Sequence, residues 1–295
     1  MVVRKRMYFG TEAGTLFALD IKDGDVAWQT QLGGAIKAAP AFDDGTLYVG
    51  DYSGKMSAVK ASDGAVRWQT QDLGTGVGSG RFYSTAAVAF GRVYAGDVDG
   101  RVYSFDQKDG SIVWTFSAGN YVYSGIAAAS TKKTKPTVYF GSHDKYAYAV
   151  DAEDGDLIWK AEPGGQVSGP ATVIGPVVYI STFSGDATSG FNIRTGRTVF
   201  KFDEGEYGPA VSDGEKLYVV GGTTVTAYDP VGLDGKYEAK KGQKGIIPPS
   251  QYRKLLKEAR KKDEGAAGGG EPAKPAGKKS SAKKQAGKQG SKNGG

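Results

Sequence analysis

The stretch Arg92–Trp114, RVYAGDVDGRVYSFDQKDGSIVW, decides the fold of this chain. It contains two short runs rich in β-branched and aromatic residues, 93–95 and 101–105, which an Asp99-Gly100 turn joins. A second turn at Asp109-Gly110 leads into a third apolar run that ends at the tryptophan. Alternating runs separated by Asp-Gly turns are typical of β-hairpins, so the stretch predicts three consecutive antiparallel strands.

The same arrangement recurs along the chain, at Tyr8–Trp28, Tyr48–Trp68 and Tyr139–Trp159 and in weaker form at Tyr179–Phe200. The tryptophans are 40, 46 and 45 residues apart, and the phenylalanine follows the last of them by 41 residues. A period of this size built from short strands is typical of β-propeller blades. We expect the large ring at the end of each repeat to be structural and to fill the wedge between neighbouring blades. These rings belong to Trp28, Trp68, Trp114, Trp159 and Phe200.

The sequence therefore predicts an all-β protein, a propeller of four-stranded antiparallel blades with about six repeats, the first and last incomplete. The first repeat begins at the strand Arg6–Phe9, so its innermost strand is expected to be missing. The last repeat has only a poor fourth strand, Lys236–Ala239. We expect an open ring, or a ring with one weak seam, and self-association through the exposed strands Arg6–Phe9 and Val225–Tyr228.

Composition divides the chain into three parts. Residues 1–239 form the propeller, residues 240–263 a linker and a short basic amphipathic helix, and residues 264–295 a Lys-, Gly-, Ala- and Pro-rich tail that is expected to be disordered. Residues 240–295 hold 16 Lys and Arg against 4 Asp and Glu, a net charge of +12, which leaves 22 against 28, or −6, for residues 1–239. A mildly acidic body thus carries a strongly basic tail.

The chain has no cysteine, which excludes disulfides, thiolate metal ligands and a cysteine nucleophile. Its first residues, MVVRKRMYFG, lack the apolar segment of a signal peptide, and no run approaches the roughly 18 apolar residues of a membrane span. Composition leaves the compartment open.

At the outer hairpin the repeats become specific, as in Ala18-x-Asp20-x-x-x-Gly24-x-x-x-Trp28 and Asp106-x-x-x-Gly110-x-x-x-Trp114. This pattern resembles the tryptophan-docking motif of the pyrroloquinoline quinone (PQQ) repeat family, whose propellers include quinoprotein dehydrogenases and the outer-membrane assembly factor BamB. The resemblance covers about residues 6–230 and implies that the tryptophans pin neighbouring blades. Lys60 replaces the aspartate in the second repeat and Phe200 the tryptophan in the fifth, which predicts looser docking there.

The resemblance also raises a cofactor, because the quinoprotein dehydrogenases bind PQQ with calcium, a catalytic aspartate and, in many, adjacent cysteines. The absence of cysteine departs from that pattern, and the aspartates of this chain fall mostly in turns, where their side chains bond to the backbone. We therefore expect no PQQ, no calcium and no catalytic residues. In Asp97-Val98-Asp99-Gly100, which mimics part of a calcium loop, no bidentate glutamate closes the ligand set.

The candidate functional residues lie in the loops between blades and in the turns before each third strand, which should open on the same face of a propeller. His143, the only histidine, is by itself more typical of a surface turn than of a catalytic base. Aromatic residues with an arginine around a concavity are typical of a recognition surface, although rings that pack between blades would explain them equally well. The candidate partner-binding face comprises Tyr52, Arg81, Tyr83, Tyr121, Tyr123, His143, Phe183 and Tyr207.

These observations favour a non-catalytic propeller that acts as a protein-interaction scaffold, associated with the cell envelope as the resemblance suggests. The alternatives are a PQQ-dependent dehydrogenase and a polyanion-binding protein that captures anionic polymer, lipid or nucleic acid through its basic tail.

Overall fold

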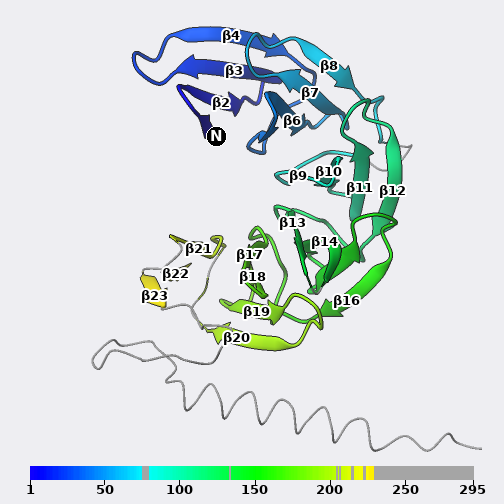
Figure 1. Ribbon diagram of the computed structural model, residues 1–295, viewed down its shortest axis with the longest axis vertical. Helices are drawn as coiled ribbons and strands as arrows, with labels where there is room; N and C mark the ends of the chain where they lie inside the picture. The colour runs from blue at the N-terminus through cyan, green and yellow to red at the C-terminus, as the bar shows by residue number, and fades with distance from the viewer. Residues whose placement is uncertain are drawn as a thin grey trace, which may run out of the picture. The chain divides into compact units, whose positions relative to one another are not determined.

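A computed structural model describes residues 1–228 except 75–79, 133, 204, 206, 214–215 and 222–223. In this part of the chain the strands form six antiparallel sheets, five of four strands and one of three, and Figure 1 shows the sheets in chain order. The prediction of an all-β propeller is confirmed. The expected helix and tail, and the fourth strand at Lys236–Ala239, lie outside the described residues.

Each sheet is one blade, and its strands pair in the order in which they follow along the chain. The first blade contains β1 (Val2–Val3), β2 (Arg6–Gly10), β3 (Thr15–Asp20) and β4 (Val26–Gln31). The second contains β5 (Ala41–Asp43), β6 (Thr46–Gly50), β7 (Met56–Lys60) and β8 (Val66–Gln69). The third contains β9 (Ala87–Ala89), β10 (Arg92–Gly96), β11 (Arg101–Asp106) and β12 (Ile112–Ser117).

The remaining blades follow the same order. The fourth contains β13 (Ala127–Thr131), β14 (Thr134–Gly141), β15 (Ala147–Asp151) and β16 (Leu157–Ala161). The fifth contains β17 (Thr172–Ile174), β18 (Val177–Ser181), β19 (Thr188–Asn192) and β20 (Thr198–Phe202). The described strands of the sixth are β21 (Val211–Ser212), β22 (Leu217–Val220) and β23 (Val225–Tyr228). The innermost strands β5, β9, β13 and β17 contact one another in succession.

Two linked predictions about the first blade are wrong, namely that its innermost strand is missing and that Arg6–Phe9 is an exposed edge, because β2 lies between β1 and β3. Its innermost strand is present, because β1 pairs antiparallel with β2 through Val2↔Met7 and Val3↔Arg6. The strand is two residues long, too short to show an alternating pattern in the sequence, and the turn at Arg4 has a φ of 53° rather than an Asp-Gly signature.

The stretch Arg92–Trp114 folds as its turns predict. Strands β10 and β11 pair from Arg92↔Asp106 to Gly96↔Val102, and the carboxylate of Asp97 closes the intervening turn by accepting the amide hydrogens of Asp99 and Arg101. At the outer turn, Gly110 has a φ of 75°, and the Asp106 carboxylate accepts the amide of Lys108 at 2.8 Å. Aspartate and glycine thus supply the local hydrogen bonds and the left-handed backbone that these turns require.

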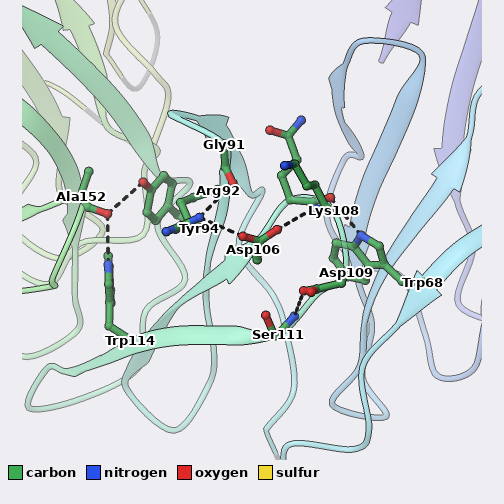
Figure 2. Close-up of polar contacts among 11 residues, drawn as sticks. Trp68, Gly91, Arg92, Tyr94, Asp106, Lys108, Asp109, Ser111, Trp114 and Ala152 are labelled. Carbon is green, nitrogen blue, oxygen red and sulfur yellow. Dashed lines mark hydrogen bonds and ion pairs between the residues drawn. The ribbon is translucent and has the colours of Figure 1, made fainter.

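The tryptophans join each of the first four blades to the next. In Figure 2, the indole Nε1–H of Trp114 and the hydroxyl of Tyr94 both donate to the carbonyl oxygen of Ala152 in the fourth blade, each at 3.1 Å. Trp28 reaches Ala61 in the same way at 3.0 Å, while Trp68 reaches Gln107 at 3.0 Å. Burial raises the pKa of Tyr94 to about 12, so its hydroxyl stays protonated and donates at neutral pH.

A glycine in the outer turn of the next blade lies under each of these indoles. A Cβ added to Gly64, Gly110, Gly155 or Gly196 would overlap the ring of the preceding blade's tryptophan. In the fifth blade, Phe200 packs edge-on against Tyr179 and Tyr228 at centroid distances of 5.5 and 5.2 Å. Phenylalanine has no N–H, so this junction has ring packing without the indole hydrogen bond.

Candidate functional site

The loops between blades and the ends of the second strands alternate along one rim of the described blades and are linked by backbone hydrogen bonds. The amide of Phe82 donates to Asp51 in the preceding blade, and the carbonyl of Arg81 accepts the amide of Val98 in its own blade. The same double link recurs at the next junctions, where Val122 donates to Asp97 and Val167 to Ser142. Repeated backbone pairing holds the loops of this rim, so the backbone positions from which their side chains extend are defined.

A small residue at the end of each second strand lets the loop approach. A Cβ on Gly10, Gly50, Gly96 or Gly141 would overlap the side chain of Ile36, Phe82, Val122 or Val167, respectively. These four apolar side chains are buried, at 4% exposure or less. The neighbouring loop residues are consequently directed outward from the rim.

The eight residues predicted as a partner-binding face are brought together as a continuous row of side-chain contacts, which we call the aromatic belt. Ring centroids are 6.2 Å apart for Tyr52 and Tyr83, 4.6 Å for Tyr83 and Tyr123, and 4.8 Å for Tyr123 and His143. The belt continues through Phe183, which is 6.1 Å from His143 and 5.2 Å from Tyr207. Tyr121 stacks on Tyr123 at 5.4 Å, and the Arg81 guanidinium lies 5.9 Å from the Tyr52 ring.

The belt is accessible along its length. Tyr83, Tyr121, Phe183 and Tyr207 are 41, 46, 48 and 57% exposed, whereas Tyr52, Tyr123 and His143 are partly buried between them. The rings are thus supported by their neighbours while presenting their outer parts to solvent. The residues come from the second to the sixth blade, so the belt crosses several junctions and is not the packing of one pair of blades.

One end of the belt is cationic. Lys37, which the sequence analysis did not identify, lies 5.8 Å from the Tyr52 ring, which the Arg81 guanidinium also approaches, and forms an ion pair with Glu12. Lys37 follows Ile36 in the loop, as Tyr83 follows Phe82, so alignment of the loops between blades would have placed it on the rim. The belt therefore combines aromatic surface with two cations at its start.

His143 lies in the middle of the belt. Its Nε2 is 2.7 Å from the hydroxyl oxygen of Ser168, a second residue that the sequence analysis missed, although Ser168 follows Val167 as Tyr83 follows Phe82. Burial lowers the pKa of His143 below its usual value, which favours the neutral ring at neutral pH. A neutral imidazole between aromatic rings is suited to ring packing and a hydroxyl contact.

The carboxylates near the rim accept hydrogen bonds from their own turns and strands, and Asp144 also accepts the amide of Gly119 in the preceding loop. Asp97 accepts the hydroxyl of Tyr103 at 3.2 Å, and Asp144 accepts that of Tyr148 at 2.5 Å. Asp51 uses one oxygen for the amide and hydroxyl of Ser53, while its other oxygen is buried without a hydrogen-bond partner. Across the described residues, no three His, Asp or Glu side chains gather as a metal site, and calcium requires about six to eight oxygen ligands.

Six antiparallel sheets, recurrent indole contacts between blades and repeats of this period define a β-propeller of the PQQ-like repeat class. A family model described as outer membrane protein assembly factor BamB matches residues 12–231. The chain belongs to this family. No curated protein matches the sequence at a significant level.

Solved structures show the same fold. BamB from Moraxella catarrhalis is 22% identical, with a TM-score of 0.63 over 77% of this chain and 68% of its own. The computationally designed protein Ika8 is 14% identical, with a TM-score of 0.66 over 78% of this chain and 70% of its own. Quinohemoprotein alcohol dehydrogenase from Comamonas testosteroni is 13% identical, with a TM-score of 0.62 over 74% of this chain and 50% of its own. Among the described residues, no helix has the length and apolar character that a membrane crossing requires.

Proposed function

We propose that this chain is a non-catalytic propeller that binds a protein partner through the aromatic belt, as a scaffold of the BamB type at the cell envelope. The observation that supports this most directly is the unbroken row of ring contacts from Tyr52 to Tyr207, with exposed rings from several blades. Tyrosine with arginine is enriched at energetically important positions of protein interfaces, because such side chains offer large contact area at low entropic cost.

Membership of the BamB family supports a role in assembly rather than in chemistry. The proposal includes both the binding of a protein partner and the location at the cell envelope. A fold shared with dehydrogenases does not by itself assign a reaction, since one propeller serves several functions. The carboxylates near the rim are engaged in turn hydrogen bonds, which favours the non-catalytic assignment.

Site-specific photo-crosslinking tests the proposal. A photoreactive phenylalanine analogue introduced at Tyr123 in the full chain should crosslink to a discrete partner in cells. Tyr83→Ala with Phe183→Ala should abolish that product by removing the ring beside Tyr123 and another ring of the belt beyond His143. The same analogue at Phe90, which is 45% exposed in the turn between β9 and β10, is the matched control and should give no such product. Equal crosslinking from both positions, or a product that persists without Tyr83 and Phe183, would contradict the proposal.

The dehydrogenase alternative has its own test. Purified protein mixed with PQQ and calcium is expected to retain no quinone absorbance after gel filtration and to show no dye-linked alcohol oxidation. Stoichiometric retention of the quinone would replace the scaffold proposal with a quinoprotein.

A further inference from the structure

A second surface feature lies away from the aromatic belt, at the junction of the first two blades. A groove of about 650 Å³ is lined by five cationic side chains, Arg4, Lys5, Arg6, Lys60 and Arg67. The first three come from the turn between β1 and β2 and from the start of β2, and the other two from β7 and β8. The one carboxylate that lines the same groove is Asp44.

Among the described residues, most of these cations have no carboxylate partner. Lys60 forms an ion pair with Asp63 at 2.6 Å, and Arg6 makes a long contact of 3.5 Å to the carbonyl oxygen of Ser62. For Arg4, Lys5 and Arg67, the described residues provide no ion pair. Residues 1–239 have a net negative charge, whereas the side chains that line this groove have a net positive charge.

Comparison of the repeats indicates that the fold does not require this charge. Lys60 occupies the position of Asp20, Asp106 and Asp151 in the other blades, where each carboxylate accepts a backbone amide of its own turn. In the second blade the same position carries the opposite charge and faces the groove. Lys60 cannot accept such a hydrogen bond; its ammonium pairs instead with Asp63 at 2.6 Å while also lining the groove.

We propose that this groove binds a ligand with several phosphate groups. Three of the five cations are arginines, whose planar guanidinium presents paired donors that match phosphate oxygens, while lysine adds a compact charge. Phe42 and Tyr8 supply the apolar part of the lining, against which the aliphatic stems of the basic side chains can pack. The phosphates could belong to a soluble molecule or to an anionic phospholipid surface.

Inositol hexakisphosphate is the soluble probe, and hydrogen exchange of the full chain locates its binding. It should protect amides of residues 3–8 and 60–67. The full chain carrying Lys60→Asp and Arg67→Glu should bind about tenfold more weakly for each cation removed, because charge-assisted hydrogen bonds are lost and carboxylates repel the ligand. Lys108→Glu, at the outer turn of the third blade, changes the net charge by the same amount as either substitution and should leave binding unchanged.

The basic residues 240–295 are present in all of these proteins, so binding by that segment cannot produce the difference between variants. Lys60→Asp alone restores the residue type of three other blades and therefore keeps the variant foldable, which circular dichroism should verify. Co-sedimentation with phosphatidylglycerol vesicles, compared with phosphatidylcholine vesicles, shows whether the phosphate groups belong to a membrane. If the double variant no longer sediments with phosphatidylglycerol vesicles, the groove binds a membrane surface. Equal affinity of the double variant and Lys108→Glu, without protection at the groove, would overturn the proposal.

Discussion

Gly96 illustrates how single residues set the spacing of the blades. It ends β10, and a Cβ there would overlap the buried side chain of Val122 from the loop that leads to the fourth blade. Gly96→Ala should lower the free energy of unfolding by roughly 1–3 kcal/mol, because overpacking a tight contact forces the loop or the strand to move. Urea denaturation monitored by tryptophan fluorescence measures the change.

Val122→Ala provides the control for this overlap. If the Cβ of residue 96 and the Val122 side chain compete for one space, the double variant should be less destabilised than the sum of the single variants, by about 0.5–3 kcal/mol of coupling. Strict additivity would mean that Gly96 is required for another reason.

His143 makes stability depend on pH. Burial lowers its pKa in the folded chain, so the unfolded chain, with a pKa of about 6.5, binds more protons in the window between the two values. Stability should therefore be complete above the unfolded pKa and decrease as the pH falls through that window. NMR titration of the single histidine should give a midpoint below that of the denatured chain, and His143→Gln should remove this part of the pH dependence. A midpoint at or above the denatured value would contradict the assignment.

At the residue scale, the sequence could identify the belt because its members recur at equivalent points of a repeat. Tyr83 and Tyr123 occupy the same place in successive loops, and His143 and Phe183 the same place in successive turns. Lys37 and Ser168 could not be identified by residue type, since neither is aromatic and their roles depend on a contact across a junction. The Gly96 contact is also invisible in the sequence, because its partner comes from the following loop.

Trp114 joins the third blade to the fourth in two ways, by ring packing and by a hydrogen bond, and substitutions can separate the two contributions. Trp114→Phe keeps a ring between the blades but removes the hydrogen bond to Ala152, which should cost roughly 1–2 kcal/mol. Trp114→Ala also leaves a cavity and should cost about 3–5 kcal/mol. Ile112→Ala on the same strand, where the side chain is 46% exposed, should change stability by less than about 0.5 kcal/mol. Thermal denaturation ranks the three, and equal losses for both Trp114 variants would indicate that the hydrogen bond alone carries the contact.

At the element scale, strands with a clear turn on each side were predicted well, and the exception has a physical reason. Strand β1 has two residues and is held by pairing with β2, so its stability comes from the neighbouring strand and not from its own pattern. The same dependence on the neighbouring strand makes the innermost strand of the sixth blade hard to predict from sequence, because β21 is also two residues long. Short innermost strands are defined by the sheet into which they fit.

For the molecule as a whole, the edge of the sixth blade decides whether chains associate. In the described part of the chain, β23 pairs only with β22, and its residues Val225–Tyr228 carry no charge. Val225 is 69% exposed. A strand of uncharged residues at the edge of a sheet can accept a strand from another molecule, and natural edges avoid this with charged residues such as lysine.

We expect the sedimentation coefficient of the chain to rise with concentration and Val225→Lys to reduce this rise, because a charge on the edge strand disfavours pairing between molecules. Val66→Lys on β8 is the matched control, since Val66 is 45% exposed and the adjacent Arg67 already supplies a charge on that strand. This control should associate as the unsubstituted chain does. A compact monomer at every concentration would contradict the prediction, because the edge of β23 would then have to be covered within the same chain, by closure of the ring or by a fourth strand.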